Sequence, residues 1–239
     1  MNLDTLGTVY GALLNFRSEA LAWAPKMNEV PYQAPPKAPV LYIKTANTWS
    51  PDGASIAVPA RAPQVEVGAT VAMVMKAPGV VGGYCLMNDL SLPHASFFRP
   101  PVKYKCLDGF LGIGGTLLPA GPDVDPSQFV LEVRINGELT QTVNFSGLVR
   151  DANKLLADVS EFMTLGAGDA LMLGCDILPQ GGRPLAQVGD RIEISAPGLG
   201  TLTNTLVAES SGDGPPLAAS GPLGGQRGHE VPSVGATSS

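Results

Sequence analysis

Apolar and polar residues alternate most clearly in the segment FVLEVRINGELTQTVNF (129–145). Leu131 and Val133 fall on one face of the predicted strand, and Glu132 and Arg134 fall on the other. The Asn-Gly pair that follows is typical of a type I′ turn, which requires a positive φ at both central residues. The segment therefore predicts a β-hairpin with Glu132 and Arg134 on its solvated face.

Most of the other apolar patterns also predict strands. The run that ends at residue 75 and the run 80–89 become almost continuously apolar, which is typical of strands buried on both faces. Residues 146–165 instead repeat apolar positions every three or four residues, which predicts a helix with Ser146 as its N-cap. Further strands are predicted within 7–15, 40–49, 54–75 (two strands), 166–174 and 187–209 (two strands), and a short helix within 16–24.

Composition changes near residue 211. The chain contains 29 glycines and 22 prolines among 239 residues, which favours many turns and short strands over long helices. From 211 onward Gly, Pro, Ser and Ala dominate and no apolar period persists. We therefore predict one domain over residues 1–210, with a mixed α+β and mainly β fold, followed by a disordered tail over 211–239.

Charge and cysteine content narrow the class of protein. The net charge of −6 gives no basic surface for nucleic acid, and no apolar run approaches the roughly 20 residues of a membrane span. The N-terminal residues lack the basic-then-apolar pattern of a secretory signal. Three cysteines without a C-x-x-C spacing favour buried thiols over disulfides or a zinc site. We expect a cytoplasmic protein without nucleic-acid or membrane partners.

Ionisable residues concentrate in the segment YCLMNDLSLPHASFFRPPVKYKCLDGF (84–110), although the chain is poor in charge overall. The segment contains Asp89, His94, Arg99, Lys105 and Asp108. Two interpretations stay open at this point: a surface loop with solvated charges, or a pocket that collects charged groups for chemistry.

The residues in this segment and in several others resemble the fumarylacetoacetate hydrolase superfamily. More specifically, they resemble the N-terminal half, or N-terminal subunit, of bifunctional isomerase/decarboxylases of the homoprotocatechuate pathway. The resemblance covers about residues 7–209 and keeps the order and spacing of several motifs. These are YQAPPKAPVLYIKTANTW (32–49), NDLSLPHASFFRPPVKYKCLDGFLGIG (88–114), RINGELTQTVNFSGLVRDANKLLADVSEFMTL (134–165), AGDALMLG (167–174) and VGDRIEISAPGLGTLTNTLV (188–207).

The resemblance implies a sandwich-like β roll with a few helices and a divalent metal, Mg²⁺ or Mn²⁺, that chelates a 2-oxo acid. The superfamily's ligands are an E-x-E pair and the Asp of N-D-x-S. Here Asp89 is present, but Gly68 and Thr70 replace the two glutamates. Glu66 would lie about 7 Å along the strand from residue 68, too far to substitute simply. Two of three expected ligands are thus missing.

Two other motifs depart from the superfamily pattern. The catalytic histidine of N-Y-x-x-H is replaced by Glu19, and the T-G-T-P loop reads Leu173–Gly174–Cys175–Asp176, with a thiol in place of a hydroxyl.

The resemblance also implies a cationic pocket. We predict Asp89 and Lys105 as catalytic residues, with Asp89 as the remaining candidate metal ligand, because fixed cations suit carboxylates and an enolate. The predicted substrate-binding residues are Lys44, Arg99, Asp108 and Cys175. Simpler interpretations exist for each: Asp89 as a turn cap, Lys105 as a solvated loop charge, Cys175 as a small buried apolar residue and His94 as a surface histidine.

The expected function is that of an enzyme subunit of aromatic catabolism. It would decarboxylate 5-oxopent-3-ene-1,2,5-tricarboxylate or isomerise 2-hydroxyhepta-2,4-dienedioate, as a homodimer or together with a homologous C-terminal-type subunit. One alternative is a non-catalytic subunit that stabilises an active, metal-bearing homologue. A further alternative is a C–C hydrolase of acylpyruvates, which requires an activated water.

Overall fold

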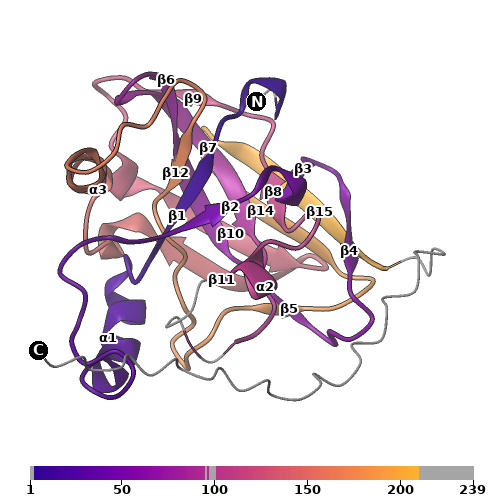
Figure 1. Ribbon diagram of the computed structural model, residues 1–239. Coiled ribbons are helices and arrows are strands. Elements are labelled where there is room, and N and C mark those ends of the chain that lie inside the picture. The colour runs from indigo at the N-terminus through magenta and orange to yellow at the C-terminus, as the bar shows by residue number, and fades with distance from the viewer. Residues whose placement is uncertain (1–2, 95, 97–100, 210–239) are drawn as a thin grey trace, which may run out of the picture. The chain divides into compact units, whose positions relative to one another are not determined.

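A computed structural model describes residues 3–94, 96 and 101–209, and its elements are shown in Figure 1. This part of the chain contains two larger β-sheets, a two-stranded ladder, three α-helices and four short 3₁₀ turns. The helices are α1 (Arg17–Met27), α2 (Val102–Lys105) and α3 (Ala152–Ser160). The predicted tail over 211–239 lies outside the described residues, as does Arg99.

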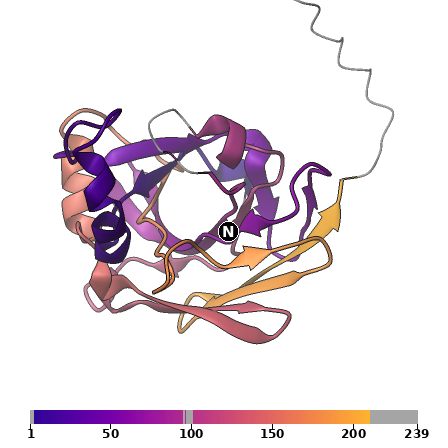
Figure 2. The same cartoon turned by 90° about the horizontal axis from the view of Figure 1, so that it is seen from below.

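The larger sheet, as far as the described residues go, has eight strands in the order β2-β1-β12-β6-β7-β8-β3, with β9 paired to β7. Seen from below, its strands curve round instead of lying flat (Figure 2). The strands are β1 (Val9–Leu13), β2 (Val40–Lys44), β3 (Trp49–Pro51), β6 (Ala69–Ala77), β7 (Val80–Asp89), β8 (Leu111–Ile113), β9 (Leu118–Pro119) and β12 (Ala170–Met172).

The smaller sheet has five strands within the described ranges, in the order β11-β10-β14-β15-β4. A short ladder pairs β5 with β13. The strands are β4 (Ser55–Val58), β5 (Val65–Glu66), β10 (Val130–Ile135), β11 (Glu138–Asn144), β13 (Leu185–Ala186), β14 (Arg191–Ala196) and β15 (Gly200–Ala208).

The core explains why β6 and β7 are so apolar. Val71 of β6 and Leu86 of β7 belong to a cluster shared with the smaller sheet and α3. Their neighbours Ala72 and Cys85 point the other way, into a second cluster with β1, β8 and β12. Both faces of these two strands are therefore buried, as their nearly continuous apolar runs predict.

The predicted hairpin is confirmed. β10 and β11 pair antiparallel, and Asn136 and Gly137 adopt φ angles of 54° and 84°, the left-handed values that a type I′ turn needs. Glu132 and Arg134 are exposed and bridge each other at 2.9 Å.

The helix predicted over 146–165 is only partly confirmed. α3 begins at Ala152, where the Asp151 carboxylate accepts a hydrogen bond from the Lys154 N–H at 2.8 Å. Ser146 is not its N-cap, because Asn144 caps a separate 3₁₀ turn, Phe145–Gly147, by accepting from the Ser146 N–H. Asn144, just before the predicted segment, caps the 3₁₀ turn, and Asp151, within the segment, caps α3; both residue types are strong N-caps.

The mainly β, mixed α+β roll expected from the sequence is confirmed. In the described ranges, none of the helices has the length and apolar character that crossing a bilayer requires. All three cysteines are free thiols, and Cys85 and Cys175 are buried.

Candidate active site

A buried ionic cluster lies at the end of β7. The Lys105 ammonium lies 2.6 Å from Asp89 Oδ2, and the Lys44 ammonium lies 2.9 Å from Asp89 Oδ1. All three side chains are fully enclosed. The Tyr42 hydroxyl also donates to Oδ2, at 2.5 Å. The Lys105 ammonium lies 4.9 Å from the centre of the Tyr42 ring, within cation–π range. The Asp89 carboxylate thus contacts two ammonium groups and accepts a hydrogen bond from the Tyr42 hydroxyl.

These contacts fix the protonation state of the cluster. Burial by itself raises the pKa of the Asp89 carboxyl, but the Lys105 and Lys44 ammoniums outweigh burial and hold that pKa well below its usual range. Burial lowers the pKa of Lys44, and the Asp89 carboxylate opposes that shift. Burial and the nearby Asp89 charge raise the pKa of Tyr42, which therefore stays a neutral donor. Two ammonium groups face one carboxylate, which gives the cluster a formal net positive charge.

Lys44 is not placed to bind substrate, contrary to the sequence prediction. Its ammonium donates to the carbonyl oxygens of Phe110 (2.8 Å), Leu90 (3.2 Å) and Lys105. An ammonium has three N–H donors, so these three carbonyls use all of them, and Asp89 Oδ1 is an ion-pair partner at 2.9 Å. The contacts join β2 at one edge of the larger sheet to the chain after β7 and before β8, which gives Lys44 a structural role.

Two glycines make the cluster possible. Gly11 of β1 lies opposite Tyr42, and a Cβ at Gly11 would lie 2.1 Å from the Tyr42 ring, so only glycine lets that ring lie across β1 toward Asp89. A Cβ at Gly68 would lie 2.3 Å from the Asp89 carbonyl oxygen. The Gly68 carbonyl accepts from the Asp89 N–H at 2.8 Å, so the two backbones are held together at this point.

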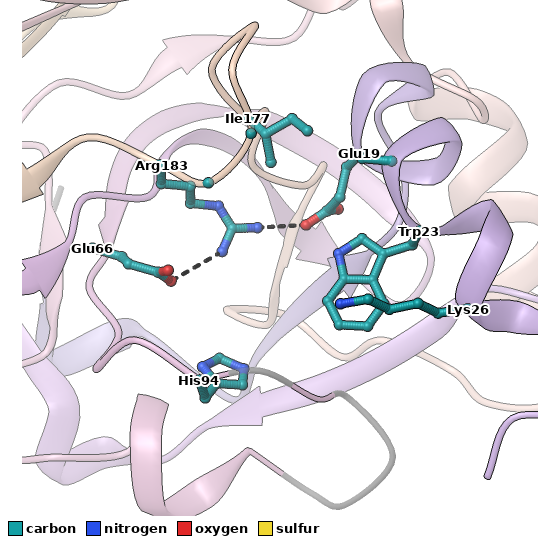
Figure 3. A pocket seen from close by; sticks show the side chains of 10 residues that line it. Glu19, Trp23, Lys26, Glu66, His94, Ile177 and Arg183 are labelled. Carbon is teal, nitrogen blue, oxygen red and sulfur yellow. Dashed lines mark hydrogen bonds and ion pairs between the residues drawn. The ribbon is translucent and has the colours of Figure 1, made fainter. Parts of the chain in front are cut away.

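A cavity of about 280 Å³ opens beside α1 and is the best candidate for a binding site (Figure 3). Its charged groups are centred on Arg183, whose Nη2 donates to Glu19 Oε1 at 2.7 Å and whose Nη1 lies 3.8 Å from Glu66 Oε2. Figure 3 shows Arg183 between the two glutamates, with Trp23 and Lys26 on the Glu19 side and His94 below. The lining residues are Glu19, Ala22, Trp23, Lys26, Glu66, His94, Ile177, Gly181, Gly182 and Arg183.

The cavity and the ionic cluster influence each other electrostatically. Burial raises the pKa of the Glu19 carboxyl, while the Arg183 guanidinium, the Leu14 N–H and the Lys105 ammonium lower it. The Asp89 carboxylate is in turn among the charges that raise the pKa of Arg183, against the lowering effect of burial. Asp89 and Lys105 are fully enclosed and do not line the cavity themselves.

The remaining predicted residues fall in different places. Cys175 is buried with its sulfur 4.0 Å from Asp89 Oδ2, and burial raises the pKa of its thiol to about 12, so it remains a neutral thiol. Asp108 is exposed, accepts a hydrogen bond from Asn47 at 2.6 Å and lies away from the cavity lining. Its expected contact with substrate is not supported by this position.

Sequence reasoning missed part of the cavity. His94 is half-buried, stacks on Tyr104 with ring centres 4.8 Å apart and lines the cavity. Arg183 was not singled out at all. Its one signal is a basic residue in an otherwise uncharged Gly/Pro-rich segment, ILPQGGRPLAQ (177–187).

Comparison with known proteins decides the family. The profile described as fumarylacetoacetate (FAA) hydrolase C-terminal matches residues 8–207, most of the chain. The chain belongs to the fumarylacetoacetate hydrolase family. Within that family it is 41% identical over 213 residues to the 4-hydroxyphenylacetate degradation bifunctional isomerase/decarboxylase of Salmonella dublin. It is 38% identical over 213 residues to the homoprotocatechuate catabolism bifunctional isomerase/decarboxylase of Escherichia coli.

Both matches cover 85% of this chain and 48% of the relative, so the chain spans about half the length of these curated relatives. A solved structure of a 5-carboxymethyl-2-hydroxymuconate delta-isomerase from Mycobacterium smegmatis superposes with a TM-score of 0.69 at 26% identity. It covers 86% of this chain and 80% of its own.

The divalent metal implied by the fumarylacetoacetate hydrolase family does not fit the donors of this chain. Gly68 has no space for the side chain of a glutamate, and the Thr70 hydroxyl donates to the Gly174 carbonyl at 2.5 Å. Both Asp89 oxygens already face ammonium groups. Across the described residues, no three His, Cys, Asp or Glu side chains are grouped to hold a metal ion.

Proposed function

We propose that this chain is a decarboxylase/isomerase subunit acting on an unsaturated 2-oxo di- or tricarboxylic acid of homoprotocatechuate catabolism. Its candidate substrates are 5-oxopent-3-ene-1,2,5-tricarboxylate and 2-hydroxyhepta-2,4-dienedioate. The observation that carries the proposal is the net positive Asp89–Lys44–Lys105 cluster beside a cavity lined by Arg183 and Lys26. The likeness to one half of named isomerase/decarboxylases supports the same substrate class.

The two reactions need the same electrostatic assistance. Decarboxylation breaks the bond between carbon and a carboxylate, releases CO₂ and leaves the electron pair delocalised as a dienolate that a proton then quenches. Isomerisation removes a proton and returns it elsewhere on the same dienolate. A fixed positive charge near the developing oxyanion stabilises both. We assign the role of a long-range positive charge to Lys105, which is enclosed outside the cavity lining and which Asp89 and Tyr42 hold in place.

Turnover of the two candidate substrates tests the proposal. Each is conjugated, so the purified chain should change its ultraviolet absorbance, and it should do so in the presence of EDTA because the donors for a metal do not fit. Lys105→Met should lower the rate about tenfold or more, because it removes a fixed positive charge that acts at a distance and not a donor in contact with the oxyanion. Lys103→Met is the matched control, because Lys103 is exposed on the same short helix and should leave the rate unchanged. Equal rates for the two variants would remove Lys105 from the mechanism.

A second candidate is a non-catalytic subunit of a metal-bearing homologue. It is favoured by the loss of two family ligands at Gly68 and Thr70. Activity that appears only on mixing with such a homologue, and that survives Lys105→Met in this chain, would select this candidate. Dimeric state and cytoplasmic location stay predictions.

A further inference from the structure

The buried guanidinium of Arg183 is rigidly placed in the cavity. Arg183 is 8% exposed and follows a tight turn in which the Leu178 N–H donates to the Gly182 carbonyl at 2.8 Å. The next residue, Pro184, accepts a hydrogen bond from the Val67 N–H at 2.8 Å, immediately before the ladder of β13 with β5. The backbone on both sides of Arg183 is therefore fixed.

The guanidinium has donors that the described residues do not use. Of its three nitrogens, Nη2 donates to Glu19 at 2.7 Å. Nη1 lies 3.8 Å from Glu66, which is an ion pair but too long for a hydrogen bond. Nε is buried and has no hydrogen-bond partner among the described residues. Buried N–H groups of this kind are rare and costly, and they call for an acceptor.

Glu19 and Glu66 hold Arg183 in different ways. Glu19 is 1% exposed, and its second oxygen accepts from the Leu14 N–H at 2.8 Å, so this carboxylate is anchored at both oxygens. The Glu66 side chain is 18% exposed, and its ion pair with Arg183 is long, at 3.8 Å. Glu19 is therefore a positioning residue, whereas Glu66 occupies a place that a ligand carboxylate can take.

We propose that Arg183 is the receptor for the carboxylate of the substrate that lies farthest from its 2-oxo group, and that Glu66 gives up its place to this carboxylate on binding. The proposal rests on the proposed function, which directs the 2-oxo acid end toward the net positive Asp89 cluster and leaves Arg183 for the other end. The charges that line the cavity are consistent with this exchange. Two positive residues, Arg183 and Lys26, face two negative residues, Glu19 and Glu66. If Glu66 turns to solvent, the lining keeps one excess positive charge for the ligand carboxylate. Arginine is well suited to this task, because its planar fork matches a carboxylate.

Binding of two matched probes tests the proposal without requiring turnover. The probes are 2-oxoheptanedioate and 2-oxoheptanoate, which differ only in the distal carboxylate, and their affinities are measured by isothermal titration calorimetry. For the unmodified chain we expect the dianion to bind about 10-fold to 100-fold more tightly, as a charge-assisted contact with a buried arginine provides. No detectable binding of 2-oxoheptanedioate, or equal affinity for both probes, would overturn the proposal.

Two variants should weaken the preference for the dianion, and a third should strengthen it. Arg183→Lys and Glu19→Gln should reduce the preference for the dianion about tenfold or more, because the fork or its positioning is lost. Glu66→Gln should increase the preference several-fold, because a competing carboxylate is removed. Arg191→Lys is the control: Arg191 is an exposed arginine that also bridges a glutamate, Glu193, at 2.6 Å, and its variant should bind both probes as before.

The Glu66 variant keeps the test decisive if an Arg183 variant does not fold. A folded Glu66→Gln chain whose preference falls or stays the same contradicts the displacement of Glu66. Failure of the proposed function gives a different result: the dianion still binds through Arg183, but neither conjugated substrate is turned over. A third result is possible: turnover depends on Lys105, but the preference for the dianion does not depend on Arg183. That result would refute Arg183 as the carboxylate receptor and leave the proposed function intact.

Discussion

Replacing Asp89 by Asn tests the buried cluster most directly, because it removes one charge while keeping the size of the side chain. The two ammoniums that face Asp89 would then be enclosed without a counter-ion. Removing one partner of a buried ion pair costs about 3–5 kcal/mol. Lys44 keeps its three carbonyl acceptors, so most of the cost falls on Lys105, whose hydrogen-bond acceptor in the described part of the chain is Asp89. We expect a loss of about 3–5 kcal/mol in the free energy of unfolding.

The loss should also depend on pH, and Lys44 determines the sign. Burial already lowers the pKa of Lys44, and removing the Asp89 carboxylate removes an influence that raises it. Between the lowered folded pKa and the unfolded pKa near 10.4, the unfolded chain binds more protons, so stability rises with pH. The penalty of Asp89→Asn is therefore largest at neutral pH and shrinks toward pH 10.

Urea denaturation followed by circular dichroism at several pH values between 7 and 10 measures both effects. Asp108→Asn provides the same chemical change at an exposed site and should cost less than about 1 kcal/mol. A loss for Asp89→Asn that matches this control, or one that does not change with pH, would refute the buried charge cluster.

Three further outcomes are expected. Gly68→Ala should destabilise the chain by about 1–3 kcal/mol and impair turnover, because the new Cβ must displace the Asp89 backbone; a melting temperature equal to that of the unmodified chain would contradict the close approach. Millimolar Mg²⁺ or Mn²⁺ should leave the melting temperature unchanged, since an ion that bound the native state would raise it. As pH falls below 3.8, the unmodified chain should lose the stability that the lowered pKa of Asp89 contributes, whereas Asp89→Asn should lack this part of the acid dependence.

Secondary-structure elements that depend on a pattern of neighbouring residues were predictable from the sequence. The Asn136–Gly137 hairpin depends on one dipeptide between alternating strands, and β6 and β7 depend on apolar runs long enough to be buried on both faces. The boundary of α3 was not predicted, because an apolar period continues past residues that cap two separate elements. Capping by Asn144 and Asp151 decides the boundary there.

The site was predictable only where a motif records it. The N-D-x-S motif identified Asp89, and the resemblance around residues 105–110 identified Lys105, which the structure joins at 2.6 Å. The role of Lys44 depends on carbonyl groups that the curved sheet brings together from three places, and no sequence pattern reports such an arrangement. Arg183 lies in a loop without periodicity, so its meeting with Glu19 is visible only in three dimensions.

Because the Lys44 amine is enclosed, its chemical modification reports local opening of the structure around β2. A lysine-directed reagent added to the native chain would label exposed Lys26, Lys103 and Lys154 at once, but it would reach Lys44 only after the contacts between β2 and the chain around β7 and β8 had separated. The rate at which Lys44 becomes modified, followed by mass spectrometry of its peptide, therefore measures how often this part of the larger sheet opens locally.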